Sequence, residues 1–596
     1  MTATKRVLSI VLAVLLLCGA FMINAAAADI PEGFTPIYTA QDLDAVRNAM
    51  SGKYILMNDI DLAGWGEWSV LGSLFSGVFD GNGHSIKNLM MRGSANAGTN
   101  HAGLFDTVTG EVRNLNMVDL KIDIDPRLYS LAGGIAATVG GLSGANYSGR
   151  IVNCTTSGFV HAEKAGGIAG ECRRSEITDC TNYAAVEGLR TVDGYGSSGY
   201  AAGIVCEMTS GSYSMDYPSV LRRCKNEGAV RGFNGAAGLV GKASGNSRGI
   251  YTYLIGCENS GSVTGANYNN PWSYGATVGG LAYETGWHGT VGFYDCVNSG
   301  TVSIDGATGA VDWQTVGGLV GYSYDSLLLR CANTGLIKGV DAEKTNQYEN
   351  KHYVGGFIGC CSDAKAIRSY CTGNISAGGI ALVGGIAGNL SGGSFYECYQ
   401  SGTINGTNDG KPFGERGNGT WDIAAVYTLG GITAKNLQMS TLASGQFTRQ
   451  ESFHLFDFTN GWEISPQKNG GMPTPRVPED PNTAGYTPAL GPYFNFPAEE
   501  KISYLDSANL GYYVRLPGKN SNAFEWSCSD TGGRVQVSKS GEVISLKQPW
   551  KWNKKCSAVV TAADPATGRS ASCKVTIAPN LLQWAAIVLL FGWIWM

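Results

Sequence analysis

The chain has 596 residues, more than a single compact domain usually contains, so several domains are expected. Hydrophobic residues make up 43% and charged residues only 15%, which excludes a disordered chain, and the 85 glycines follow no collagen-like Gly-x-x period. The net charge of -5 and the lack of a basic run give no sign of a nucleic-acid partner.

The N-terminus has the pattern of a secretory signal peptide. Lys5 and Arg6 precede an apolar run over residues 7–23, and the alanines at 25–28 offer a cleavage site of small residues. We therefore expect residues 1–28 to be a signal peptide and the protein to be exported, to the bacterial cell surface or the extracellular space. An uncleaved N-terminal anchor is the alternative interpretation of this run.

The next segment predicts a short helix and then strands. Thr39 followed by Asp42 is typical of a helix start, and Leu43, Val46 and Met50 form an apolar stripe behind it. A strand is expected at residues 54–56, and two turn-rich stretches follow it at 58–62 and 79–89.

Two short patterns then alternate along the middle of the chain. The first is Cys-x-Asn-x-Gly-x-Val, and its copies begin at Cys224, Cys257, Cys296 and Cys331, with weaker copies at Cys154, Cys180 and Cys398. One copy departs, because Ser369 stands at the first position and Cys371 two places later. The second pattern is two small residues and two apolar ones, beginning at Gly133, Gly166, Ala202, Ala237, Gly279, Gly317, Gly355, Gly384 and Gly430.

The spacing of the two patterns predicts a solenoid. The second glycine is followed 13 residues later by the first position of the next copy at 167→180, 318→331, 356→369 and 385→398, whereas the return leg varies. Strands this short cannot bury a face alone, so successive units must stack and share one core. Stacking lets the asparagine amides form a ladder, and it favours buried free thiols over disulfides or zinc ligands. The expected fold class is all-β, with a right-handed parallel β-helix over residues 29–479 that begins with a capping helix.

Several of these segments resemble the bacterial GLUG-motif β-helix proteins. The matching stretches are "YILMNDIDLAGW", "GVFDGNGHSIKNL", "AGLFDTVTGEVRNL" and the recurrent "GGIAG" or "GGLVG", within residues 35–475. The resemblance implies an exported, often surface-attached β-helix. Such regions also occur as appendages of immunoglobulin A metallopeptidases, but the six histidines form no His-Glu-x-x-His, so that activity is not carried over.

The C-terminal part changes character. Residues 480–494 are rich in proline and glycine and are expected to be a linker, and short strands within 495–578 predict a small β-sandwich. "FEWSCSD", "VQVSKSGEVISL" and "CKVTI" resemble bacterial Ig-like group-2 domains, in which Cys556 and Cys573 are candidates for a disulfide across neighbouring strands. Residues 579–596 form a hydrophobic tail that we expect to contact a membrane, as a tail anchor or an interfacial helix, unless it is the stub of a shortened protein.

The candidate ligand-binding residues are aromatic side chains in the insertions between coils. They are Tyr195, Tyr200, Tyr268, Trp272, Tyr274, Trp313, Tyr348 and Tyr353. Tyrosine and tryptophan among Gly, Ser and Asn suit recognition of sugars or of a partner chain. The alternative is that these rings pack only against their own loops.

A second set of candidates is acidic. Asp119, Asp123 and Asp125 share a face if their segment is a regular strand, which would suit Ca²⁺ or paired-acid chemistry, although a solvated strand face is the simpler interpretation. No catalytic motif is recognised and no cofactor is expected. The main hypothesis is a non-enzymatic, adhesin-like or structural surface protein that binds an extracellular glycan or protein. The alternative is an enzyme, a lyase or hydrolase, that acts on polysaccharide in a groove along the helix.

Overall fold

The computed structural model describes most of the chain between residues 30 and 589. The described ranges are 30–93, 101–125, 130–141, 148–189, 199–210, 218–245, 252–266, 275–286, 289–305, 313–339, 351–379, 381–406, 411–430, 439–477, 493–494, 496–504, 506–515, 521–530, 534–545, 556–586 and 588–589. The expected signal peptide lies outside these residues.

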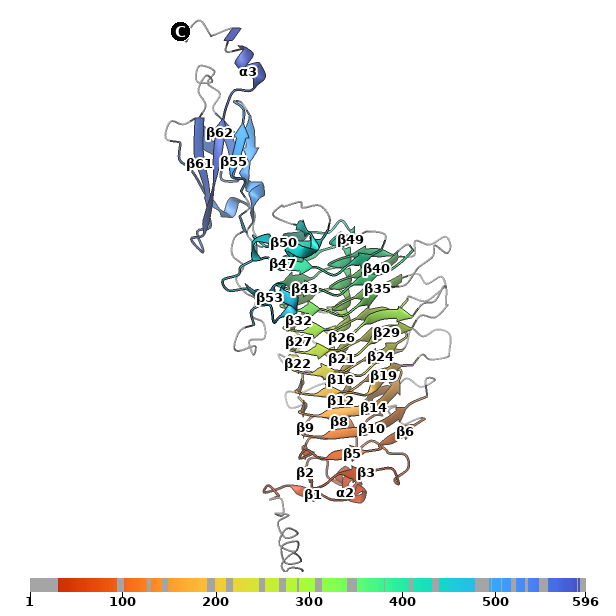
Figure 1. Cartoon of the computed structure of the whole chain (residues 1–596). Coiled ribbons are helices and arrows are strands. Elements are labelled where there is room, and N and C mark those ends of the chain that lie inside the picture. The colour runs from red at the N-terminus through yellow and green to blue at the C-terminus, as the bar shows by residue number, and fades with distance from the viewer. Residues whose placement is uncertain are drawn as a thin grey trace, which may run out of the picture.

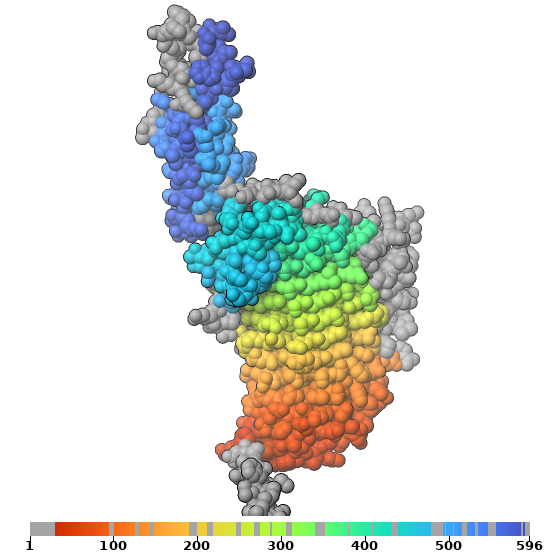
Figure 2. Space-filling model, viewed as in Figure 1, coloured from red at the N-terminus to blue at the C-terminus, as the bar shows by residue number. Residues whose placement is uncertain are grey.

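The main body is a parallel β-helix, as the repeats predict (Figure 1). One coil consists of β21 (Val205–Thr209), β22 (Ser219–Arg222), β23 (Lys225–Asn226), β24 (Val230–Gly232) and β25 (Gly235–Ala237), after which β26 (Val240–Ser244) begins the next coil. Each strand pairs in parallel with its equivalent one coil later, as β21 does with β26. The coils therefore stack as successive bands along one axis (Figure 2).

Stacking produces continuous sheets along the whole helix. Among the described residues, the sheet that contains β21 has ten strands, from β8 (Phe105–Val108) to β49 (Phe413–Arg416). The sheet that contains β25 has nine strands, from β7 (His101–Ala102) to β45 (Leu382–Gly384). The β22, β23 and β24 columns belong to a third, larger sheet. The side chains that point inward from all of these strands form one apolar core.

A short helix lies at the N-terminal end of the solenoid. Helix α2 (Ala40–Ala45) begins at Thr39 with a capping box: the Thr39 hydroxyl accepts from the Asp42 amide, and the Asp42 carboxylate accepts from the Thr39 amide. The buried Leu43 and Val46 join the core. The helix start expected from Thr39 and Asp42 is thus confirmed, and strand β1 (Thr35–Ile37) pairs with β2 (Lys53–Leu56) beside it.

An asparagine ladder runs through the interior of the coils, as the sequence predicts. Its members come from five successive coils and are fully buried: Asn182, Asn226, Asn259, Asn298 and Asn333. In the first four, the amide nitrogen donates to the side-chain oxygen of the next member at 2.7–2.8 Å. All five also donate to the carbonyl two residues along their own strand at 2.9–3.0 Å. Both amide hydrogens are therefore satisfied in the first four, which removes the cost of burying them.

The departing repeat copy fits this ladder by exchanging two positions. Cys371 pairs in register with Asn333 and takes the ladder position of its coil. The Asn333 amide contacts the Cys371 sulfur at 3.5 Å. Ser369 takes the thiol position, and its hydroxyl accepts from the Cys331 amide at 3.0 Å. The late cysteine thus reflects an exchange of side chains within an unchanged backbone register.

The ladder explains the second glycine of the Gly-Gly pattern. A Cβ atom on Gly238 would lie 2.2 Å from the Asn259 Cγ and 2.2 Å from the Gly280 carbonyl oxygen. Gly203 faces Asn226 in the same way. The backbone of one column therefore lies directly against the asparagines of another, so the two sequence patterns depend on each other.

The cysteines of the coils are free thiols, as expected. Among the described residues no cysteine forms a disulfide, and all except Cys528 are buried. Burial raises the pKa of Cys371 to about 11 and that of Cys398 to about 12, because a thiolate is costly in an apolar interior. These thiols therefore act as small apolar core groups.

A column of left-handed residues forms one corner of the coils, each directly before the thiol position. It includes Asp179, Arg223, Asp295 and Arg330, with φ between 49° and 55°. Opposite charges face each other in consecutive coils. Asp179 and Arg223 pair at 2.6 and 2.8 Å on the surface, and Asp295 and Arg330 pair at 2.6 and 2.7 Å with exposed side-chain fractions of only 10% and 7%.

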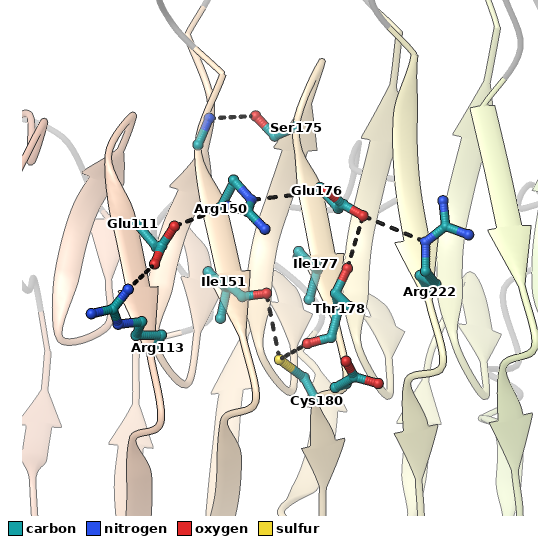
Figure 3. Close-up of polar contacts among 12 residues, drawn as sticks. Glu111, Arg113, Arg150, Ile151, Ser175, Glu176, Ile177, Thr178, Cys180 and Arg222 are labelled. Carbon is teal, nitrogen blue, oxygen red and sulfur yellow. Dashed lines mark hydrogen bonds and ion pairs between the residues drawn. The ribbon is translucent and has the colours of Figure 1, made fainter. Parts of the chain in front are cut away.

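Next to this corner, the outer face of the third sheet carries a charge ladder in the N-terminal coils (Figure 3). Glu111 contacts both Arg113 and Arg150 at 3.0 Å, and Glu176 lies 3.9 Å from Arg150 and 3.5 Å from Arg222. Acidic and basic side chains alternate and neutralise one another. The ladder therefore joins neighbouring coils and does not form a patch of one sign.

The same outer face becomes apolar in later coils and is covered by a segment after the last coil. The outward column continues as Ile255, Tyr294, Leu329, Ile367 and Tyr396. Residues 444–476 pack on it with Phe447, Phe453, Phe456 and Trp462. This segment contains η2 (Ser444–Gln446), η3 (Gln450–Ser452), β52 (Trp462–Glu463), η4 (Asn469–Gly471) and β53 (Thr474–Pro475).

In its described residues the C-terminal part has two small sheets around a separate core, besides the two-stranded pair of β54 (Tyr493–Phe494) and β57 (Val514–Arg515). One contains β55 (Glu499–Ile502), β62 (Ser570–Ile577), β61 (Cys556–Ala563) and β58 (Glu525–Cys528), and the other contains β56 (Ser507–Asn509), β60 (Glu542–Ser545) and β59 (Val535–Val537). The suggested disulfide is wrong: Cys573 lies opposite Val560 and Cys556 opposite Ile577, and both thiols are free. Helix α3 (Leu581–Ala586) follows, and no described helix is long and apolar enough to span a membrane.

Candidate functional site

An open hollow of about 460 Å³ lies near the C-terminal end of the β-helix. Its volume is within the range of about 300–1,000 Å³ that is usual for ligand sites. The lining combines two carboxylates, one indole, several hydroxyls and glycine backbone: Ser362, Asp363, Ser391, Gly392, Gly393, Ser394, Gly419, Thr420, Trp421 and Asp422. We call this region the Asp363–Trp421 hollow.

Three consecutive coils supply the lining. Asp363 comes two residues before β42 (Lys365–Ile367), Ser394 lies in β47 (Gly393–Gln400), and Trp421 and Asp422 begin β50 (Trp421–Leu429). In register, Lys365 pairs with Ser394 and Ser394 with Asp422, so these three side chains form one column. The hollow therefore lies where successive coils turn into the third sheet, and its walls are fixed by the ladder of paired strands.

Glycine shapes the floor of the hollow. Gly393 has φ of 128°, and a Cβ atom there would lie 2.4 Å from the Ala364 carbonyl oxygen. A Cβ atom on Gly419 would overlap the Ser391 carbonyl. Larger residues at these two positions would push the coils apart, so the glycines allow the close approach that brings the polar groups of three coils together.

The two carboxylates have different surroundings. Asp363 is on the open side, and partial desolvation together with the negative charge of Asp325 raises its pKa. The half-buried Asp422 accepts a hydrogen bond of 2.6 Å from the hydroxyl of Tyr396, whose ring is buried in the aromatic cluster under residues 444–476. Asp422 is therefore positioned by the core, whereas Asp363 faces solvent and protonates more readily than an ordinary aspartate.

The indole of Trp421 is fixed by a cation. The Arg416 guanidinium lies 5.0 Å from the Trp421 ring centre and 5.3 Å from that of Phe413. Burial lowers the pKa of Arg416. Arg416 thus occupies one side of the Trp421 indole, and Trp421 also lines the hollow. The indole gives the site a rigid apolar wall beside its two carboxylates.

A second hollow, of about 140 Å³, lies between the β-helix and the C-terminal part, lined among others by Glu397, His454 and Arg569. Glu397 is almost fully buried and accepts hydrogen bonds of 3.0 Å from Arg368, Trp462 and Tyr493. Its carboxylate is already engaged by three donors, and the volume is below the usual range for a ligand site. This acid therefore anchors residues 444–476 and Tyr493 to the coils.

The structure describes three of the eight predicted aromatic site residues, and the other five, Tyr195, Tyr268, Trp272, Tyr274 and Tyr348, lie outside the described residues. Tyr200 is half-buried and stacks on Tyr283 with ring centres 5.5 Å apart. Trp313 packs edge-on against Tyr353 at 5.5 Å. Tyr353 is only 2% exposed and donates to Glu415 at 2.8 Å. Each of these rings packs against a neighbouring ring and none lines the Asp363–Trp421 hollow, so ligand binding by these residues stays a prediction.

The acidic trio lies on the outer face of its segment, which has a bulge at Asp119. Asp119 has φ of 54° at a register shift between Met117 and Leu120, which breaks the alternation of β10 (Asn116–Asp123). Asp123 lies 3.6 Å from His161. Asp119 and Asp123 are exposed and Asp125 is half-buried, whereas the even-numbered residues between them are buried. The expected shared outer face is therefore confirmed, but the part of the chain that the structure describes contains no group of three metal-binding side chains.

Sequence reasoning missed Asp363, Trp421 and Asp422 because none belongs to a repeat pattern. The available signal was the tripeptide Thr420-Trp421-Asp422 after a run rich in glycine and asparagine, near the end of the coils. Asp363 precedes Asp422 by 59 positions in the chain, and only the register of the coils brings the two residues to the same hollow.

Comparison with known proteins gives little beyond this. No family model and no curated protein matches the sequence, so the GLUG and Ig-like resemblances stay predictions. Among the solved structures that match is a crystal structure described as a putative immunoglobulin A1 protease from Bacteroides ovatus. It is 18% identical, the match covers 74% of this chain and 91% of that one, and the TM-score is 0.31.

That description contradicts the expectation of a non-enzyme, and we do not keep that expectation. The low identity and TM-score assign no peptidase activity to this chain. The catalytic potential of the chain must therefore be judged from its own side chains.

Proposed function

We propose that the protein is an exported surface protein whose β-helix displays the Asp363–Trp421 hollow as a binding site for neutral, hydroxyl-rich glycans. The observation that carries the proposal is the lining: an indole beside two carboxylates and at least three hydroxyls, in a volume of about 460 Å³. Sugars present hydroxyl donors to carboxylates and apolar C–H faces to aromatic rings.

The charges of the hollow favour neutral glycans over acidic ones. Asp363 and Asp422 line it and Asp325 lies close enough to influence Asp363, whereas the Arg416 charge is directed at the rings of Phe413 and Trp421. A uronic or sialic acid would meet two carboxylates and no lysine or arginine among the lining residues, which is unfavourable in a partly desolvated site.

The rigidity of the coils supports a display role. The parallel pairing of β42, β47 and β50 holds the backbone of the hollow in register, so little ordering cost accompanies binding. The expected signal peptide and the surface location belong to the same proposal. Fractionation of cells with an antibody against the coils tests them, and protein confined to the cytoplasm would contradict them.

Membrane contact through the C-terminal tail is part of the proposal. The side chains of Leu581, Leu582 and Leu589 are 87%, 80% and 78% exposed, and residues 581–596 carry no charge. Such apolar exposure suits insertion at a bilayer interface. The full chain should sediment with phosphatidylcholine vesicles, and a chain that ends at residue 580 should not. Equal sedimentation of both would refute this contact.

The binding proposal is tested on a glycan array with the full chain and two variants. Trp421→Ala should reduce binding to neutral glycans at least 10-fold, since it removes the apolar wall. Trp313→Ala is the matched control, an aromatic on another sheet and one of the sequence candidates. Both variants should keep the far-UV circular dichroism and melting temperature of the parent within a few degrees. Loss of binding only in Trp313→Ala would move the site to the aromatic residues predicted from sequence.

A further inference from the structure

We propose that the Asp363–Trp421 hollow hydrolyses the neutral glycans it binds, with Asp363 as general acid and Asp422 as general base. This inference rests on the proposed glycan binding and goes beyond it to a reaction. Its basis is geometric: two carboxylates from different coils line one open hollow.

The coil register sets the separation of the two acids. Asp422 lies two paired strands beyond Lys365, and Asp363 is two residues before Lys365. Strands in a sheet are about 4.8 Å apart, so the two acids originate roughly 10 Å apart along the helix axis. Asp363 also precedes Lys365 by two residues, up to about 7 Å along the strand direction, so the Cα atoms of the two acids lie roughly 10–12 Å apart. Carboxyl groups directed toward each other from that separation can hold a water molecule between them. Inverting glycosidases need about 6.5–9.5 Å between the carboxyl groups, whereas retaining enzymes need about 5–5.5 Å.

The surroundings of the two acids suit the two roles. Asp363 is partly desolvated beside Asp325 and holds its proton more readily, as a general acid must. Asp422 accepts a hydrogen bond of 2.6 Å from the Tyr396 hydroxyl, which fixes the orientation of its carboxyl group. Tyr396 is thus a positioning residue, because its hydroxyl acts on the substrate only through Asp422.

The reaction balances without a metal, cofactor or oxidant. Asp363 gives its proton to the bridging glycosidic oxygen as the bond from that oxygen to the anomeric carbon breaks. Asp422 accepts a proton from a water molecule while the water oxygen bonds to the anomeric carbon. Two hydroxyl-ended sugars leave, and exchange with solvent returns the proton to Asp363 and removes the one on Asp422.

The test uses the full chain and the neutral glycans that it retains on the array. Release of new reducing ends is measured for the parent, Asp363→Asn and Asp422→Asn, with Asp305→Asn as a control acid on a distant outer strand position. The two site variants should lose at least 100-fold in rate, a much larger loss than any loss of glycan binding, while the control should match the parent in both. NMR of the fresh product should show inverted anomeric configuration, and retained configuration would overturn the role of Asp422.

Tyr396→Phe separates positioning from folding. Without the hydroxyl, kcat should fall about 10-fold or more while KM stays within 2-fold, since the buried ring still packs. If the parent binds glycans but releases no reducing ends, hydrolysis is overturned and binding stands. If it binds no glycan at all, both proposals fail. Hydrolysis that survives both aspartate substitutions would also overturn the assignment.

Discussion

The paired charges at the left-handed corner allow a controlled measurement of how burial changes the contribution of an ion pair to stability. Asp179–Arg223 and Asp295–Arg330 occupy the same position in their coils, with the same φ region and nearly equal hydrogen-bond lengths. They differ in exposure: the side chains of the first pair are 41% and 49% exposed, and those of the second 10% and 7%. A difference in unfolding free energy between matched variants of the two pairs therefore measures the effect of burial.

The expected magnitudes follow from that difference. Loss of the exposed pair in Asp179→Ala should lower the free energy of unfolding by about 0.2–1 kcal/mol, because water screens the attraction between the two charges. Asp295→Ala leaves the Arg330 guanidinium buried without its partner, which should cost about 3–5 kcal/mol. The cost of placing alanine at positive φ occurs in both variants and cancels in the comparison. Asp295→Ala should therefore be about 2–5 kcal/mol more destabilising than Asp179→Ala.

The assay is urea unfolding followed by circular dichroism, with hydrogen exchange to locate the affected coils. Solenoids unfold in segments, so exchange should increase most in the coils next to residue 295. The double variant Asp295→Ala/Arg330→Ala should recover part of the loss, because it removes the unpaired charge. Equal destabilisation by Asp179→Ala and Asp295→Ala would refute the reasoning that burial determines the contribution of these pairs.

Three further predictions concern the ladder, the glycines and pH. Asn259→Ala leaves buried amide and carbonyl groups of two neighbouring coils without partners, so it should lower the free energy of unfolding by about 3–5 kcal/mol. The control, Glu258→Ala at an exposed ion pair, should lower it by at most about 1 kcal/mol. Equal urea midpoints for the two variants would contradict this. Gly238→Ala should lower the melting temperature strongly, whereas Gly64→Ala, which has open space, should not; the reverse order would be inconsistent with the ladder contact. Hydrogen bonds from Thr576 and Lys574 lower the pKa of Glu499 to about 2. The ionised Glu499 therefore stabilises the C-terminal part at pH values above its ordinary pKa near 4.5, and this contribution should fade as the pH falls toward 2. Glu499→Gln should remove this pH dependence, and an NMR titration that gave an ordinary pKa for Glu499 would refute the prediction.

The sequence by itself determined the solenoid. Repeated cysteines, asparagines and glycines at fixed offsets leave stacking as the way for short strands to bury a face, and the buried Asn226–Asn259 contact follows from that register. The start of the capping helix at Thr39 was readable for the same reason, since a capping box is a local interaction.

Only the tertiary structure decided the candidate site. Asp363 and Asp422 are far apart in the chain and belong to no repeat, and the number of coils between them brings them to one hollow. The bulge at Asp119 and the cover of residues 444–476 over the apolar outer face were likewise set by packing between distant segments. Local patterns specify a coil, whereas the meeting of particular side chains depends on which coils are neighbours.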